Sequence, residues 1–150
     1  MVKHVIVAMF KDKDAAVGAA TAIKSLATSG TAKFKLKAGV MLRKDDQGNV
    51  SPLEAHDRPL HQTKFGATVG ALIGLIAGPA GAALGAALGA GVGVIGDAVT
   101  WGLSSAFVNS VTSEMGPGTT AIIVEADEGD PGPVNEIVKL GGGRVYREAF

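Results

Sequence analysis

The sequence predicts one α+β domain with an apolar helical insert in its middle, and three observations predict it. The chain has 150 residues, the size of a single domain with a real core. Short apolar runs rich in β-branched residues alternate with helical patterns on both sides of the middle. All 14 basic and 14 acidic residues lie outside residues 65–96, so an ordinary charged domain surrounds an uncharged insert.

The first part of the chain predicts a strand, a helix and a second strand. Residues 4–10 form a nearly continuous apolar run, as in a buried strand. Residues 11–30 carry apolar positions at helical spacing, with Asp12 or Asp14 as the N-cap. Residues 33–43 alternate apolar and polar side chains, which indicates a half-buried strand with one polar face.

The chain beyond the insert predicts two more helices and two more strands. Residues 104–115 predict a helix capped by Ser104 or Ser105, and residues 130–143 predict a short helix with proline near its start. The remaining predicted elements are a turn at residues 45–49, a short edge strand at 50–55 containing Pro52, and strands at 119–126 and 144–150.

Without the insert, the predicted order is β-α-β-(β)-α-β-α-β. The simplest arrangement is a ferredoxin-like sandwich, in which an antiparallel sheet carries helices on one face. The opposite face of the sheet is then open unless another segment covers it. We therefore expect a single domain over residues 1–150, with a body at 1–60 and 104–150 and a glycine-zipper helical hairpin inserted at 61–103.

The insert repeats glycine at every fourth position on either side of a turn at Pro79. Residues four apart share one face of a helix, so each arm presents a groove without side chains. Helix backbones approach one another closely at such small-xxx-small grooves. The glycines expected to pack in this way are Gly66, Gly70, Gly74 and Gly78 in the first arm and Gly81, Gly85, Gly89 and Gly93 in the second.

The glycine ladder also requires neighbours. Eight glycines inside helices cost on the order of 6–8 kcal/mol relative to alanine, which is comparable to the stability of a whole domain. Lipid or packing against other copies must therefore offset this cost. The arms have about 14 and about 17 residues, whereas a helix that crosses a bilayer takes about 20, so both arms are short for a crossing.

Basic residues gather on the strand at residues 33–43 and at the entry to the insert. Contact with anionic lipid head groups is one interpretation, and a solvated strand face is the other. Nucleic acid is not an expected partner, because the formal net charge is zero and no aromatic residues alternate with the lysines. The residues that would contact lipid are Lys33, Lys35, Lys37 and Lys64.

The other chemistry-bearing residues predict no catalytic site and no cofactor. The chain has no cysteine, and no serine lies in a nucleophile motif. The run GVGVIG at residues 91–96 matches a dinucleotide fingerprint in letters only, because it lies inside the ladder. His4 is expected to be a partly buried structural histidine. One cluster of polar residues is interpreted either as a divalent metal site or as an ordinary polar loop, and its members are Glu54, His56, Asp57 and His61.

Three stretches carry a resemblance to a known family: LHQTKFGATVGALIGLIAG, GVIGDAVTWGLSSAFVNSVTSEMGPGTTAIIVEAD and GGGRVYREAF. They resemble the bacterial DUF1269 family, whose members are labelled predicted membrane or stress-associated proteins of unknown function. The resemblance covers nearly the whole chain, and its most specific elements include the Thr63-Lys64 entry to the ladder and the Asp97 exit. It implies a ferredoxin-like body around a glycine-zipper hairpin and brings no catalytic residues.

Together these observations predict a non-enzymatic protein that assembles with copies of itself through its hairpins. We expect it in the cytoplasm, with association with the inner membrane as an open alternative and a stress-related role implied by the resemblance alone. The alternative function is a soluble module that binds a small ligand or a metal on the open sheet face or at the His56/His61 loop.

Overall fold

The structure of this protein is a computed structural model, and it describes residues 1–30, 33–53, 65–77 and 102–150. These residues form five strands and four helices. The predicted α+β class is confirmed. In chain order the elements are β1 (Val2–Phe10), α1 (Lys13–Thr28), β2 (Phe34–Lys44), β3 (Val50–Pro52), α2 (Ala67–Ala77), α4 (Ser105–Glu114), β4 (Thr120–Glu128), α5 (Gly132–Leu140) and β5 (Arg144–Ala149).

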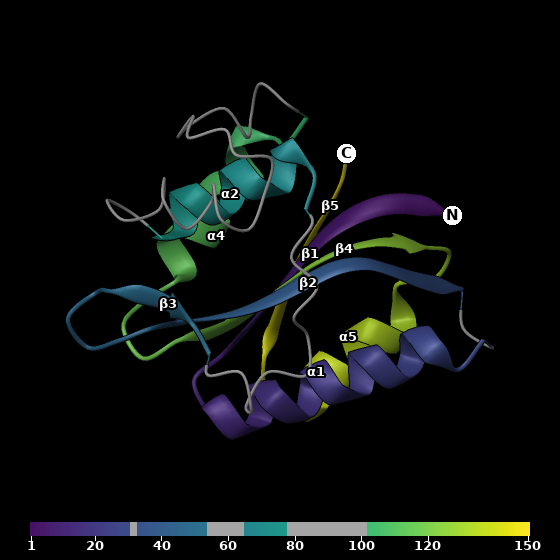
Figure 1. The fold of residues 1–150 in the computed structure, drawn as a ribbon, viewed down its shortest axis with the longest axis horizontal. Helices are drawn as coiled ribbons and strands as arrows, with labels where there is room; N and C mark the ends of the chain where they lie inside the picture. Colours follow the sequence, from purple (N-terminus) through teal and green to yellow (C-terminus); the bar gives the residue numbers. More distant parts are fainter. Residues whose placement is uncertain (31–32, 54–64, 78–101) are drawn as a thin grey trace.

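The five strands form one sheet in the order β3-β2-β4-β1-β5, and every neighbouring pair is antiparallel. Strands β1 and β4 pair along their full length, from Val2 opposite Glu128 to Phe10 opposite Thr120. From Val5 to Phe10 in β1 and along most of β4, side chains are buried on both faces of the sheet, which explains why each strand reads as a nearly continuous apolar run rather than an alternating one. Figure 1 shows the sheet as the middle of three layers.

Helices α1 and α5 cover one face of the sheet (Figure 1). Asp12 is the N-cap of α1 and accepts a hydrogen bond from the Asp14 N–H at 3.1 Å, so the first of the two predicted caps is the one used. The apolar stripe of α1 and two valines of α5 pack against Ile6 and Phe10 of β1. The buried helix residues in this layer are Ala16, Ala19, Ala20, Ile23, Val134 and Val138.

Helices α2 and α4 cover the opposite face, which was expected to be open unless another segment covered it. The expectation that the body helices share one face is wrong for α4. Ser104 caps α4, its hydroxyl accepting from the Phe107 N–H at 3.1 Å. The physical reason for the second layer is that Val5 and Val7 of β1 present a second apolar surface, which two helices with apolar faces bury. The helix residues in this core include Val69, Leu72, Ile73, Ile76, Phe107, Val108 and Val111.

Strand β2 changes face partway along its length. The register shifts between Leu36 and Ala38, which is a β-bulge. Phe34 before the bulge packs in the layer of α1 and α5, whereas Val40 after it packs in the layer of α2 and α4. Met41 is also buried, on the α1 side. The prediction of one polar face is therefore wrong for the second half of this strand, which is central and covered on both sides.

Candidate functional site

The start of α2 is fixed to the sheet by a carboxylate. Glu125 of β4 is 8% exposed, and its Oε1 accepts a hydrogen bond from the Gly66 N–H at 3.2 Å. Gly66 is the residue before the helix, and its carbonyl accepts from the Gly70 N–H at 3.0 Å. A negative charge at a helix N-terminus is stabilised by the helix dipole and by the free N–H groups there. The uncharged segment is thus anchored where it begins.

Helix α2 carries the described part of the glycine ladder. Gly66 is exposed, whereas Gly70 and Gly74 are buried. From Thr68 to Ile76 no residue is fully exposed. A helix that is apolar all round belongs to a protein core or to an apolar contact, not to a water-facing surface. The other expected ladder positions lie outside the described residues: Gly78, Gly81, Gly85, Gly89 and Gly93.

Three of the four expected lipid-contact lysines, Lys33, Lys35 and Lys37, lie at the end of the sheet where α2 begins. Lys33 and Lys35 are exposed, and Lys37 forms an ion pair with Asp127, with 3.4 Å between Nζ and Oδ2. Asp127 lies two residues from Glu125 on β4 and therefore on the same face, beside the start of α2. Lys64 lies outside the described residues.

A buried charged cluster joins four elements on the α1 side of the sheet, and sequence reasoning missed it. The Glu128 side chain is fully buried, and Arg147 of β5 donates to it from Nε at 2.6 Å and from a terminal nitrogen at 3.1 Å. Nδ1 of His4 lies 2.9 Å from the same carboxylate, so the predicted structural role of His4 is confirmed. Arg147 also donates to the Asn135 side chain of α5 at 2.8 Å.

This cluster is organised to hold elements together. A fork of two parallel hydrogen bonds between guanidinium and carboxylate is both strong and directional. Both oxygens of Glu128 are engaged by Arg147, and one of them also by His4. The cluster ties β5 and α5 to β1 and β4, and it presents no carboxylate to solvent.

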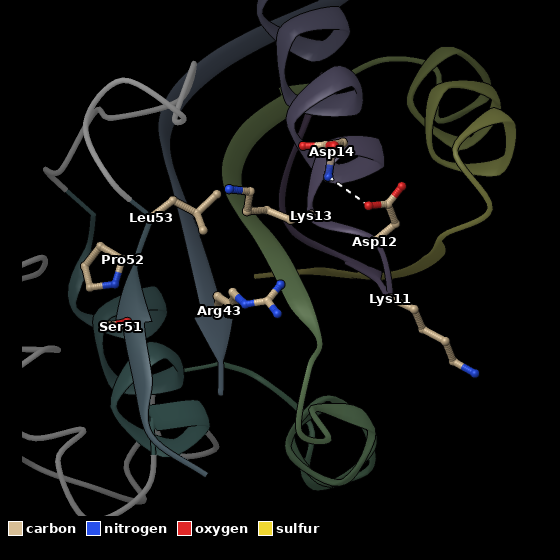
Figure 2. Close-up of a pocket in the computed structure, with 8 residues that line it drawn as sticks. All are labelled: Lys11, Asp12, Lys13, Asp14, Arg43, Ser51, Pro52 and Leu53. Atoms are coloured by element: carbon tan, nitrogen blue, oxygen red, sulfur yellow. Dashed lines mark hydrogen bonds between the residues drawn. The ribbon is translucent and has the colours of Figure 1, made fainter. Parts of the chain in front are cut away.

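A hollow of about 680 Å³ lies between the start of α1 and the end of β3. Figure 2 shows Lys13 and Leu53 extending into this space, whereas Lys11 points away from it. The lining is mostly charged, unlike the apolar lining of a typical ligand pocket. The charged residues that line it are Lys11, Asp12, Lys13, Asp14 and Arg43.

Two of the sequence expectations concern metals and membranes. Within the described ranges, no three His, Asp or Glu side chains are grouped so that they could hold a metal ion. The loop cluster of Glu54, His56, Asp57 and His61 lies outside those ranges. Among the helices that the structure describes, none has the length and apolar character needed to span a bilayer.

Comparison with known proteins gives one match. A family described as "Protein of unknown function (DUF1269)" matches residues 63–149, which is more than half of the chain and includes the whole of α2, α4, β4, α5 and β5. No curated protein and no solved structure matches the chain.

Proposed function

The chain belongs to the DUF1269 family, and from that premise we propose that it is a non-enzymatic protein that assembles with copies of itself through its glycine ladders. One observation carries the proposal. Residues 65–96 contain no charged residue and repeat glycine every fourth position on either side of Pro79, and in α2 no residue from Thr68 to Ile76 is exposed. Glycines inside a helix lower its stability, and close packing against neighbouring helices offsets that cost.

The body of the protein supports a ferredoxin-like arrangement as part of this proposal. Strands β2, β4, β1 and β5 are adjacent in that order, and α1 and α5 connect β1 to β2 and β4 to β5 on one face. The added layer of α2 and α4 fills the other face. One side of α2 is therefore used within the chain, and our proposal assigns the contact with partners to the ladder glycines that follow α2 in the sequence.

Cross-linking of ladder variants tests the proposal. Gly85→Leu fills the groove of the second arm and is expected to abolish cross-linked multimers in intact cells. Ala86→Leu adds the same side chain to the same arm off the ladder and is expected to leave multimers in place. Gly74→Leu is less informative, because Gly74 is buried and a leucine there disturbs the chain's own packing. If Gly85→Leu cross-links like the wild type, the ladder does not drive assembly.

We also propose contact with an anionic membrane surface through Lys33, Lys35, Lys37 and Lys64. The observation in favour is that Lys33 and Lys35 are exposed at the end of the sheet where the uncharged segment is anchored. Each lysine near such a surface contributes about 1 kcal/mol. Co-sedimentation with phosphatidylserine vesicles tests this: Lys33→Glu with Lys35→Glu should weaken binding, whereas Lys24→Glu with Lys139→Glu in the opposite helix layer should not.

Binding of a small ligand is the alternative proposal. The sheet face expected to be open is covered by α2 and α4, so that version is wrong. The hollow of Figure 2 is the remaining place for a small ligand. Its lining has three basic residues against two acidic ones, Asp12 and Asp14, and this small excess of positive charge favours an anion. Calorimetric titration with inorganic phosphate is the test. Binding that Arg43→Ala removes and Arg144→Ala preserves supports the alternative, and equal weak binding by all three proteins contradicts it.

A further inference from the structure

Strand β5 is an edge of the sheet that the described residues form. The strand order places β3 at one edge and β5 at the other, and within the described residues no strand lies beyond β5. Strand β3 is a poor template because it has three residues and one of them is Pro52, which has no N–H. Strand β5 has six residues and no proline. An exposed edge of this length offers a row of backbone groups to another strand.

The hydrogen-bond pattern shows which groups of β5 face outward. The Phe150 N–H donates to the Lys3 carbonyl at 3.2 Å, which continues the ladder between β5 and β1. Bonded pairs alternate along antiparallel strands, so the even-numbered residues of β5 bond to β1. The N–H and C=O groups of Val145, Arg147 and Ala149 therefore point away from the sheet.

We propose that β5 pairs with β5 of a second copy, antiparallel and centred on Tyr146. In this register Val145 exchanges backbone hydrogen bonds with Arg147 of the second copy, and the reverse pair does the same. Tyr146 then faces its own equivalent across a two-fold axis. The inference rests on the proposed function in one respect, namely that the chain forms homo-oligomers, and it adds a contact surface other than the glycine ladder.

Charge selects this register among the symmetric ones. Centring on Tyr146 places Arg144 opposite Glu148 of the second copy, twice, at positions where side chains approach most closely. Centring on Arg147 instead places two arginines directly opposite each other, which is unfavourable. Centring on Val145 pairs only the first three residues of β5. A parallel partner would place Arg144 beside its own equivalent.

The charged side chains of β5 are available for this pairing. Charges on an edge strand commonly block addition of another strand, unless the partner is complementary. The Arg144 side chain is 75% exposed, and its ion pair with Glu114 is long, at 3.5 Å. Glu148 accepts hydrogen bonds from Ser104 and retains further lone pairs. Arg147 is held on the opposite face by Glu128, so its charge is already compensated.

Disulfide trapping tests the pairing, because the chain has no natural cysteine. Tyr146→Cys should convert to a disulfide-linked dimer under mild oxidation, since residues opposite each other at this kind of position have Cα atoms about 4.5 Å apart. Arg144→Cys and Glu148→Cys, mixed as differently tagged chains, should form the mixed dimer. Neither variant should form a disulfide with a second copy of itself. In this register, each of these residues is displaced from the same residue of the second copy by four residues along the strand, about 13 Å.

Lys24→Cys, exposed on α1, is the background control. The mixed pair keeps the test decisive if Tyr146→Cys fails to fold. If the mixed pair forms no more dimer than the Lys24→Cys background, the inference is overturned. If that result accompanies wild-type multimers that Gly85→Leu removes, edge pairing is wrong and the ladder proposal stands. If the mixed dimer forms and Gly85→Leu changes nothing, the edge pairing stands and the ladder proposal fails.

Discussion

Arg147 and Arg144 lie three residues apart on β5 and differ sharply in surroundings. The Arg147 side chain is 15% exposed against a fully buried Glu128, whereas Arg144 is 75% exposed beside a half-exposed Glu114. Removing one partner of a buried pair leaves an uncompensated charge, so Arg147→Ala should lower the free energy of unfolding by about 3 kcal/mol. Urea denaturation measures this.

The matched control is Arg144→Ala, which removes the same side chain from the same strand. An exposed ion pair contributes at most about 1 kcal/mol, so the free energy of unfolding should change by less than that. Equal losses in the two variants would show that the Glu128 cluster contributes no more than a surface pair.

Asp45 begins the turn between β2 and β3. The backbone N–H groups that donate to its carboxylate, first that of Asn49, hold the pKa of Asp45 below its ordinary value of 3.8. A lowered folded-state pKa contributes stability above the unfolded-state pKa and loses it as the pH falls through the folded value. The stability difference between wild type and Asp45→Asn should therefore shrink below about pH 4. Urea denaturation at several pH values checks this, and a difference independent of pH contradicts it.

Local sequence predicts some of the side-chain interactions and not others. The caps Asp12 and Ser104 were predictable because each acts within three residues of itself. The Glu128 cluster was not, because His4 lies 124 residues away and Arg147 lies 19 away. A glutamate at the end of the buried β4 run was the one available signal.

At the scale of elements, α2 acts as a core helix of the body. Leu72 is fully buried against the sheet and α4, so Leu72→Ala should cost about 2–5 kcal/mol of unfolding free energy. Leu140→Ala, at an 85% exposed position of α5, should change it by less than about 0.5 kcal/mol. Chemical denaturation of both variants decides the point: similar small effects would mean that α2 is not seated on the sheet.

The helices and strands were placed well from periodicity, yet the faces of β2 were not. An alternating pattern from Phe34 to Leu42 predicts one buried face, but the bulge at Lys37 reverses which face the later side chains occupy. A bulge adds one residue without leaving a compositional mark. Met41 and Gly39 are buried because helices cover both sides, which periodicity within one strand cannot show.

At the scale of the whole molecule, the uncharged segment was identified from composition but its relation to the sheet was not. The absence of charge from residues 65–96 requires an apolar neighbour, and composition does not distinguish the chain's own sheet from another copy. The structure shows that α2 uses the sheet. The glycines beyond α2 remain the basis of the self-assembly proposal.

The mass of the purified particle, measured by light scattering after size exclusion with and without mild detergent, tests self-assembly most directly. The account predicts a wild-type particle containing several 15.0 kDa chains, which Gly85→Leu reduces in size and Ala86→Leu does not. A wild-type protein that is a 15.0 kDa monomer in both conditions would contradict it.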